Sequence, residues 1–483
     1  MHPSQTRFGR QRRFELLLFV LLLIATLLVF GLRPGTHLER VKDAGVLTVI
    51  TRNSPTTYYI GPEGPTGPEY DLAKAFADEL GVELEIITPE SFADIMPAIE
   101  NGDADFAAAG LTVTDSRAER VRFAPAYQTI TQQLVYRSGR GRERPDSFEA
   151  LEGAIIDVVA GSSHVEQLER LKPEYPELSW KPHRSADSEE LLYLVWEGLM
   201  DFTIADSNEV TLNQRFYPEL TVAFDVTDPE ELAWAFPPGK DDSLYREAVK
   251  FFEAIKADGR LDQILERHYG HAERLDYVGT RIYLRHIAKR LPDYRDLFKE
   301  AAEAYDLDWR LLAAIGYQES HWNPKARSPT GVRGLMMLTQ RTARQMDVQN
   351  RLDPRQSIMG GARYFMHVKD KIPDRIQEPD RTWLALAAYN VGFGHLEDAR
   401  KITEYQGGDP DKWIDVMERL PLLSQKAYYK YTRYGYARGR EPVKYVQNIR
   451  SYYDILVWVT TDESTARHPA SMDPVYRIAP SSL

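Results

Sequence analysis

Glu319 lies at the end of a predicted amphipathic helix, where a carboxyl group can do acid–base chemistry. Leu312 and Ile315 precede it by two turns and one turn, so the three side chains share one helix face. Apolar surroundings disfavour the charged carboxylate and raise its pKa, which suits a general acid at neutral pH. A buried glutamate paired with an arginine produces the same pattern, so the helix alone leaves both interpretations open.

The sequence that follows Glu319 supplies no second carboxylate. Residues 319–339, ESHWNPKARSPTGVRGLMMLT, contain no other acidic residue, so any acid–base chemistry here would rest on one carboxyl group. The chain has no cysteine, and His321, His367 and His395 are scattered. We therefore expect no metal site, no cofactor and no disulfide.

The composition limits the class of protein. A chain of 483 residues with 27% charged and 43% hydrophobic residues is typical of two or three soluble globular domains, which excludes collagenous, wholly disordered and polytopic membrane proteins. Residues 1–270 hold 27 basic and 45 acidic residues, and residues 271–483 hold 33 and 27, so the net charges are −18 and +6. Two domains with different partners are expected, and the basic excess is too small to indicate nucleic acid.

Residues 1–32 have the pattern of an export signal. Four arginines precede an apolar run over residues 16–32, and this order keeps the arginines in the cytoplasm. The segment is either a cleaved signal peptide or an uncleaved anchor. Both interpretations place the remaining chain outside the cytoplasm. Because no cysteine can carry a lipid, membrane association without the leader would be peripheral.

Residues 33–270 alternate between strand-like and helix-like segments. A β-branched strand over 46–50 is followed by a helix over 70–81, a strand over 82–87 and a helix over 92–102. Such alternation predicts an α/β domain with a mainly parallel sheet, which binds ligands at the carboxyl ends of its strands.

Three segments of this half resemble the bacterial extracellular solute-binding proteins of family 3: residues 110–127, 157–170 and 197–210. The resemblance covers roughly residues 38–270 and implies a two-lobed domain that binds an amino acid or a muropeptide. It assigns the ligand carboxylate to Arg117 and the ligand ammonium to Asp206. Ser162 precedes a predicted helix, whose N–H groups suit the same carboxylate. An exposed Arg117 and a helix-capping Asp206 are the alternatives.

Residues 271–483 show helical periodicity and are predicted to be mostly α-helical. Their last third contains an aromatic and basic stretch over residues 428–453. Aromatic faces stack on sugar rings, so this stretch is either a wall of a glycan-binding groove or the edge of a helical core.

Four short motifs in this half occur in a fixed order: Glu-Ser, Gly-Leu-Met, Ala-Tyr-Asn and Tyr-Val. Together they resemble the lysozyme-like catalytic domain of lytic murein transglycosylases of family 1, the soluble-lytic-transglycosylase type, over about residues 290–460. The resemblance implies that Glu319 is the sole catalytic acid and base. The residues that it implies in substrate binding are Ser320, Gly334, Leu335, Met336, Tyr389, Asn390 and Tyr445.

Three positions depart from the common pattern of these motifs. Met337 stands where glutamine usually follows Gly-Leu-Met, which removes one polar contact. Val391 replaces the usual small residue after Ala-Tyr-Asn, and Pro442 replaces a frequent threonine. These departures concern substrate positioning rather than the class of reaction.

The joined resemblances imply a lyase that cuts the bond between N-acetylmuramic acid and N-acetylglucosamine in peptidoglycan glycan strands. Its product is a 1,6-anhydromuramyl end, formed without water. The implied location is the periplasmic face of the outer membrane, with peripheral attachment, or the inner membrane facing the periplasm if the leader is retained. The rival interpretations are a solute sensor whose second domain only grips glycan, and hydrolysis by the same fold.

Overall fold

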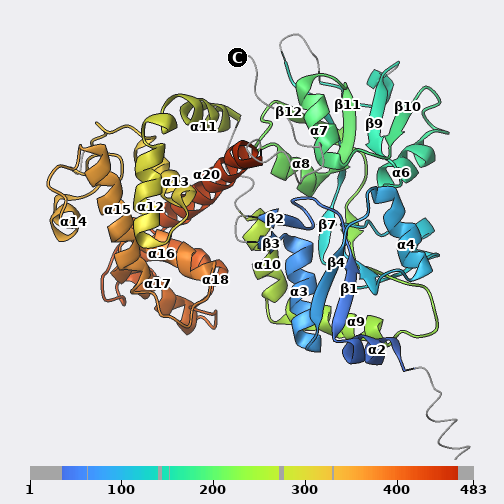
Figure 1. Cartoon of the computed structure of the whole chain (residues 1–483), viewed down its shortest axis with the longest axis horizontal. Coiled ribbons are helices and arrows are strands. Elements are labelled where there is room, and N and C mark those ends of the chain that lie inside the picture. Colours follow the sequence, from blue (N-terminus) through green and yellow to red (C-terminus); the bar gives the residue numbers. More distant parts are fainter. Residues whose placement is uncertain are drawn as a thin grey trace, which may run out of the picture.

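The computed structural model describes residues 35–61, 64–139, 144–151, 153–270, 277–328 and 331–465. The predicted leader, residues 1–32, lies outside these ranges. Two α/β lobes are followed by a separate helical domain (Figure 1). Within the ranges described, no helix is both long enough and apolar enough to cross a membrane.

The first lobe is a five-stranded sheet covered by helices. Its strands are β1 (Val46–Ile50), β4 (Glu83–Ile87), β5 (Phe106–Ala107), β6 (Arg122–Phe123) and β14 (Ala235–Phe236). Its helices are α2 (His37–Ala44), α3 (Pro68–Leu80), α4 (Ile95–Asn101), α5 (Asp115–Ala118), α9 (Ser243–Ala257) and α10 (Arg260–Tyr269). The strand order is β4-β1-β5-β14-β6. The lobe packs around an aromatic cluster in which Phe106 stacks on Trp234 at 4.4 Å between ring centroids.

The second lobe repeats this plan with a sheet in the order β10-β9-β11-β8-β12. The strands are β8 (Gln132–Arg137), β9 (Ile155–Val159), β10 (Ser179–His183), β11 (Phe202–Asp206) and β12 (Leu220–Asp225). The helices are α6 (Ser163–Leu171), α7 (Ser188–Glu197) and α8 (Ser207–Asn213). β11 is buried at every position and lies at the centre of the sheet.

Both sheets are mainly parallel, as the sequence predicts, and each contains one antiparallel strand that the sequence does not predict. In the first lobe β14 runs antiparallel to β5 and β6, and in the second lobe β8 runs antiparallel to β11 and β12. The chain crosses between the lobes twice, through β7 (Gln128–Ile130) and β13 (Glu230–Leu232), which pair with each other. The strand that follows each crossing enters its sheet from the opposite lobe, and this reverses its direction.

The remaining described chain is helical, as its periodicity predicts. The α-helices are α11 (Tyr277–Lys289), α12 (Arg295–Tyr305), α13 (Trp309–Ser320), α14 (Gln340–Gln345), α15 (Pro354–Lys369), α16 (Asp380–Val391), α17 (Phe393–Tyr405), α18 (Trp413–Arg419), α19 (Lys426–Tyr429) and α20 (Arg440–Thr465). They enclose one hydrophobic core, which includes the fully buried residues Leu312, Phe365 and Ile449.

Helix α20 joins the helical domain to both lobes (Figure 1). Arg450 donates to the Glu266 carboxylate in the first lobe at 2.6 Å. Asp454 accepts from Arg215 in the second lobe at 2.8 Å. Trp458 packs on Phe216 with ring centroids 4.9 Å apart. Helix α20 therefore belongs to the helical domain and contacts both lobes of the α/β domain.

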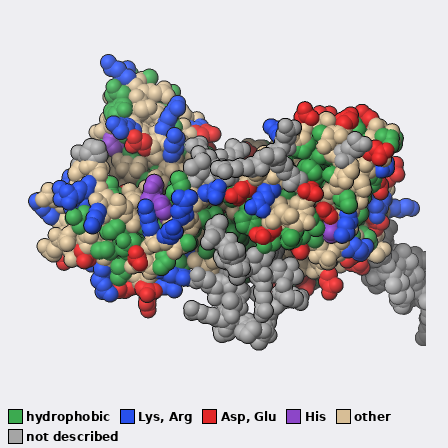
Figure 2. Space-filling model, turned by 90° about the horizontal axis from the view of Figure 1, so that it is seen from above, with side chains coloured by type: hydrophobic (Ala, Val, Ile, Leu, Met, Phe, Trp, Pro, Cys, Tyr) green, Lys and Arg blue, Asp and Glu red, His purple; other side chains and the backbone are tan. Residues whose placement is uncertain are grey.

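The surface charge follows the same division. On the face shown in Figure 2, Lys and Arg side chains gather over the helical domain, and Asp and Glu side chains line the outer edge of the two-lobed domain. On this face, the uneven distribution agrees with the opposite net charges of the two halves of the sequence.

Candidate active site and ligand-binding cleft

Glu319 is held in the last turn of α13. The Asp308 side chain starts this helix by accepting from the Arg310 N–H at 2.8 Å. The helix ends at His321, which adopts the left-handed conformation with φ 52°. Leu312 and Ile315 are fully buried on the face predicted from their spacing. Glu319 therefore lies where the apolar face of α13 meets the edge of the core.

The Glu319 carboxyl has one close partner. Tyr445 donates its hydroxyl hydrogen to Glu319 Oε1 at 2.6 Å. Burial raises the pKa of Glu319 to about 7, and the Tyr445 hydrogen bond opposes that rise. No cationic side chain in the described ranges forms an ion pair with Glu319. The site therefore lacks the buried glutamate–arginine pair that the helix pattern left open.

Two tyrosines form a wall beside this carboxyl. Tyr445 comes from α20 and Tyr389 from α16, and their rings are stacked with centroids 6.3 Å apart. The Tyr389 hydroxyl donates to the Met336 carbonyl at 3.3 Å. Asn390 follows Tyr389 in α16, and its side chain is exposed. Of these predicted site residues, Tyr445 contacts Glu319 directly and Asn390 does not.

The Gly-Leu-Met turn packs against α13. The Ser320 hydroxyl donates to the Leu335 carbonyl at 2.9 Å and to the Gly316 carbonyl at 3.1 Å. A Cβ on Gly334 would lie 1.8 Å from the Arg351 carbonyl oxygen, so only glycine fits there. The side chains of Leu335 and Met336 are fully buried. This turn therefore joins α13 through the Leu335 carbonyl and through the buried Met336 side chain, whose sulfur lies beside Gly316.

A second contact between α13 and α20 was not predicted from the sequence. Asn448 donates to Gln318 at 3.1 Å, one residue before Glu319 and one helical turn after Tyr445. The shared one-turn spacing of Tyr445 and Asn448 is the only sequence feature that indicates it. Together the two contacts fix how α20 lies on the end of α13.

The aromatic stretch over residues 428–453 was predicted to be either a wall of a glycan-binding groove or the edge of a helical core, and its two parts differ in this respect. Tyr431, Tyr434 and Tyr436 are exposed and precede α20. Tyr445 and Tyr452 lie within α20 and are buried in the core. The helical part is therefore the edge of a core, and only the preceding segment offers aromatic faces to a glycan.

In the two-lobed domain, Arg117 is buried and already paired. Its Nε donates to Glu166 Oε1 at 2.8 Å, and its Nη2 donates to the Gly161 carbonyl at 3.1 Å. Both partners belong to the opposite lobe. A Cβ on Gly161 would lie 2.8 Å from Ala93 Cα, so the two lobes are in close contact here. The cleft is closed, and Glu166 occupies the guanidinium that was predicted to hold a ligand carboxylate.

The other two predicted ligand residues lie in the same closed cleft. Ser162 precedes α6, and both its N–H and its hydroxyl donate to the Val159 carbonyl, at 3.3 and 2.7 Å. Asp206 is the N-cap residue of α8 and also accepts from His164 at 3.0 Å. Arg117, Ser162 and Asp206 line one cavity of about 20 Å³. The structure thus brings the three predicted residues together, whereas the sequence gives no indication of Glu166.

The fold and the two sites define a class of protein, a solute-binding domain joined to a lysozyme-like transglycosylase domain. The family model for bacterial extracellular solute-binding proteins, family 3, matches residues 47–271. The model for the Transglycosylase SLT domain matches residues 296–411. The predicted fold class, a two-lobed α/β domain followed by a mainly α lysozyme-like domain, is confirmed.

Curated relatives match nearly the whole chain. Membrane-bound lytic murein transglycosylase F of Saccharophagus degradans is 51% identical over 458 residues, which are 95% of this chain and 91% of that protein. Membrane-bound lytic murein transglycosylase F 1 of Alkalilimnicola ehrlichii is 53% identical over 428 residues, 88% of this chain and 86% of that protein. A mutant arginine-binding protein from T. maritima is 23% identical with a TM-score of 0.44, over 48% of this chain and 99% of that one. The chain belongs to the membrane-bound lytic murein transglycosylase F family.

Proposed function

We propose that the chain cleaves the β-1,4 bond between N-acetylmuramic acid and N-acetylglucosamine in peptidoglycan, with Glu319 as its only acid and base. Family membership supports a lytic murein transglycosylase, a lyase that cuts peptidoglycan. The observation that carries the assignment to Glu319 is its isolation, because a carboxyl without an ionic partner and with a pKa of about 7 can give and take a proton near neutral pH.

In the first step Glu319 acts as the acid. Its proton moves to the glycosidic oxygen while the bond from that oxygen to C1 of the muramyl residue breaks. The carbonyl oxygen of the neighbouring N-acetyl group bonds to C1 and holds the developing positive charge. The Tyr445 hydroxyl, 2.6 Å from Glu319 Oε1, stabilises the carboxylate that this step leaves behind.

In the second step Glu319 acts as the base. It takes the proton of the C6 hydroxyl of the same sugar, O6 bonds to C1, and the N-acetyl oxygen leaves. The carboxyl is then protonated again and a 1,6-anhydro ring has formed. No water is consumed, so the masses of the two products add up to that of the substrate, whereas hydrolysis would add one water.

The substrate-binding roles follow from the placement of the residues around Glu319. Tyr445 and Tyr389 form a stacked aromatic pair that bounds the site beside the Glu319 carboxyl. Ser320 holds the turn at Gly334, Leu335 and Met336 against α13, so these residues position the site through their packing on α13. The Asn390 side chain is exposed beside Tyr389, so among these substrate-binding residues we assign it to a contact with the glycan at the surface of the site.

The test is a digest of purified murein sacculi by the full-length chain and by Glu319→Gln, with products read by mass spectrometry. We expect anhydromuramyl ends from the parent, and release at least about 1,000-fold slower from the variant. Glu303→Gln, an exposed carboxylate on α12, is the matched control and should match the parent. Release by Glu319→Gln at the parental rate would refute the proposal. Sacculi left intact by a folded parent would instead favour a glycan-gripping sensor.

We propose further that an amino acid or muropeptide binds at Arg117, Ser162 and Asp206 and changes the rate of cleavage. Helix α20 supports this, since it carries Tyr445 at one end and contacts both lobes through Arg450 and Asp454. The digest is repeated with and without saturating ligand. Coupling between two binding sites is reciprocal. If the ligand changes the affinity for a glycan fragment by some factor, the glycan fragment must change the affinity for the ligand by the same factor. Equal rates with and without bound ligand would exclude the coupling.

The proposed organisation is a leader at residues 1–32, a regulatory domain at 33–270 and a catalytic domain at 271–483. We also propose a peripheral position on the periplasmic face of the outer membrane, which the leader pattern and the membrane-bound relatives support. Density-gradient separation of the two membranes tests the position. Recovery with the outer membrane, and release by high salt, is expected. Recovery in the inner membrane would favour a retained anchor.

A further inference from the structure

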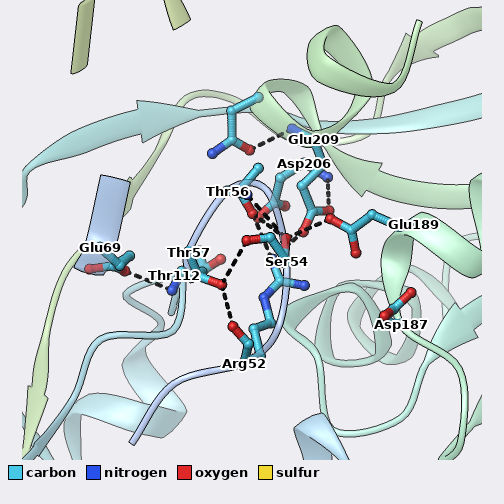
Figure 3. A network of polar contacts seen from close by, with 12 residues as sticks. Arg52, Ser54, Thr56, Thr57, Glu69, Thr112, Asp187, Glu189, Asp206 and Glu209 are labelled. Carbon is cyan, nitrogen blue, oxygen red and sulfur yellow. Dashed lines mark hydrogen bonds and ion pairs between the residues drawn. The ribbon is translucent and has the colours of Figure 1, made fainter. Parts of the chain in front are cut away.

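The arginines that the structure buries are each paired with a carboxylate. An enclosed pair of the same kind joins Arg52, which follows β1 in the first lobe, to Glu209 of α8 in the second (Figure 3). Residues 425–440, which connect the short helix η5 (Leu420–Ser424) to α20, carry their charge differently. This tyrosine segment contains five basic residues, five tyrosines and no acidic residue. Its cations are therefore not balanced from within the segment.

The basic side chains of the tyrosine segment are all exposed. They are Lys426, Lys430, Arg433, Arg438 and Arg440. Arg438 pairs with Glu441 at 3.2 Å, but the two side chains are 73% and 59% exposed, and such a pair contributes little. The other four form no ion pair with any residue that the structure describes. The surface of the segment is therefore strongly positive.

Three tyrosines of the segment stand among these cations. Tyr431, Tyr434 and Tyr436 are 80%, 52% and 57% exposed. Lys430 Nζ lies 4.4 Å from the centroid of the Tyr431 ring, and Arg433 Cζ lies 5.6 Å from that of the Tyr434 ring. Each of these two rings thus has a cation of the same segment over it. The segment presents aromatic rings and positive charges as one surface.

The backbone that carries these side chains is fixed by buried contacts. Asp398 of α17, which is only 2% exposed, accepts from the N–H groups of Arg433 at 3.1 Å and Tyr434 at 2.8 Å. A Cβ on Gly439 would lie 1.6 Å from the Leu420 carbonyl oxygen, so only glycine fits there. Binding residues commonly lie on loops that a rigid scaffold positions in this way. The exposed tyrosines are therefore held in place rather than carried on a loose connection.

We propose that the tyrosine segment is the surface through which the chain docks on a bilayer that contains anionic phospholipids. Tyrosine rings favour the headgroup level of a bilayer, where the apolar ring leaves water and the hydroxyl stays hydrated. Lys and Arg side chains are attracted to anionic headgroups, and salt screens this attraction. The inference rests on the proposed peripheral position on the outer membrane and names the surface responsible for it.

A glycan strand is the other partner that an aromatic surface can fit. The sugars of a glycan backbone carry no charge to balance the cations, and a cation already lies over the rings of Tyr431 and Tyr434. An anionic headgroup layer matches both parts of the surface at once, because it accepts the rings at its depth and the cations at its phosphates. Charge complementarity therefore favours the bilayer.

The experiment uses the absence of cysteine from the chain, which allows one introduced cysteine to be labelled alone. Full-length Tyr431→Cys carrying nitrobenzoxadiazole is mixed with phosphatidylcholine vesicles, with vesicles that also contain phosphatidylglycerol, and with murein sacculi. We expect emission to rise at least about twofold with the phosphatidylglycerol vesicles only, and high salt to reverse the rise. Leu199→Cys, 73% exposed after α7 in the second lobe, is the matched control and should not respond.

The two labelled chains share the predicted leader, so attachment through the leader alone would not favour one position over the other. An equal response at both positions would overturn the inference, as would no response at Tyr431→Cys. A response of Tyr431→Cys to sacculi in place of vesicles would identify the tyrosine segment as a glycan-binding surface and would also overturn it.

Charge variants separate the tyrosine segment from the rest of the basic domain. In labelled Tyr431→Cys, Lys426→Gln together with Arg433→Gln should weaken binding to phosphatidylglycerol vesicles at least about tenfold. Arg341→Gln together with Arg344→Gln removes two exposed charges from α14 and should change binding less than about twofold. Equal weakening by both pairs would mean that only net charge matters, and would refute the assignment to the segment.

Fractionation of the parent distinguishes this inference from the proposed position. If the parent is recovered with the outer membrane while Tyr431→Cys does not respond to vesicles, the peripheral position stands and the tyrosine segment is excluded. If the parent is recovered with neither membrane and Tyr431→Cys does not respond, both proposals fail. If the parent is recovered with the outer membrane and Tyr431→Cys alone responds, both are supported.

Discussion

Glu319, the proposed catalytic carboxyl, and Glu166 of the binding cleft are buried in contrasting ways. Glu319 has a single hydrogen bond, from Tyr445, and burial raises its pKa to about 7. Glu166 is also partly buried, which by itself would raise its pKa, but the Arg117 charge and hydrogen bonds from Ser116 and Thr114 outweigh burial and lower it. The same side-chain type is thus about half protonated near pH 7 in one site and charged in the other.

The contrast follows from what each site must do. A general acid and base changes its charge in every cycle, so strong partners for one charge state would slow it. A binding cleft that opens and closes exchanges one ionic partner for another while its own charge stays constant. Isolation of the carboxyl suits the first task, and dense pairing across the lobes suits the second.

The largest effect that tests this contrast is the pH dependence of stability at Glu319. Because the pKa rises from 4.5 to about 7 on folding, the native state keeps a proton that the unfolded chain has lost, and stability falls as pH rises through that window. Glu319→Gln removes this loss. We expect the variant to be roughly 3 kcal/mol more stable than the parent at pH 8, with the difference vanishing near pH 4.

Denaturant unfolding of parent and variant at several pH values measures that difference. Glu166→Gln should change the stability in the opposite direction. A carboxyl whose pKa is lowered on folding stabilises the native state above its unfolded pKa, and this stabilisation is lost as pH falls. The variant should therefore be less stable than the parent at neutral pH and equal to it at low pH. Parallel pH profiles for the parent and Glu319→Gln would show that Glu319 titrates like an ordinary exposed glutamate.

A smaller effect is expected when the single partner of Glu319 is removed. Tyr445→Phe deletes a hydrogen bond that lowers the pKa of Glu319, so its pKa should rise further. The loss of activity on the alkaline side should then move to higher pH, and kcat should fall about tenfold because the carboxylate formed in the first step loses its donor.

The pH profile of sacculus digestion measures both changes. Tyr389→Phe is the control, because its hydroxyl donates at 3.3 Å to the Met336 carbonyl rather than to Glu319. In Tyr389→Phe, the pH at which activity is lost on the alkaline side should stay the same as in the parent. The role assigned to Tyr445 would be contradicted if the alkaline loss of activity moved to lower pH in Tyr445→Phe. It would also be contradicted if that loss moved by the same amount in both variants.

The local features of the catalytic site were predictable from the sequence. Helical spacing placed Glu319 beside Leu312 and Ile315, and all three lie where it predicts. The motifs identified Tyr445 as a site residue, but not that its hydroxyl would touch Glu319, because the two are brought together by the packing of α20 on α13. Periodicity fixes the face of a helix and leaves open which helix covers it.

The cleft was less predictable, since its contacts join residues that are distant in the sequence. Arg117 was identified from its motif, whereas Glu166, its partner across the cleft, was not. Arg52 and Glu209 lie on different lobes, and neither is marked by local spacing or composition. The single antiparallel strand of each sheet was missed for a related reason, because strand direction depends on where the chain crosses between lobes.

The smallest expected effect tests whether Glu166 competes with a ligand for Arg117. Glu166→Gln weakens the ion pair that closes the cleft, so a ligand carboxylate should displace it more easily, and we expect about threefold tighter binding of the amino acid or muropeptide in calorimetry. Arg184→Gln removes another pair between the lobes, to Asp94 at 2.7 Å, whose side chains are 69% and 50% exposed. An exposed pair contributes little, so affinity should not change in this control. Weaker binding by Glu166→Gln would mean that Glu166 belongs to the ligand site itself, and the contrast with Glu319 would then rest on Arg52 and Glu209 alone.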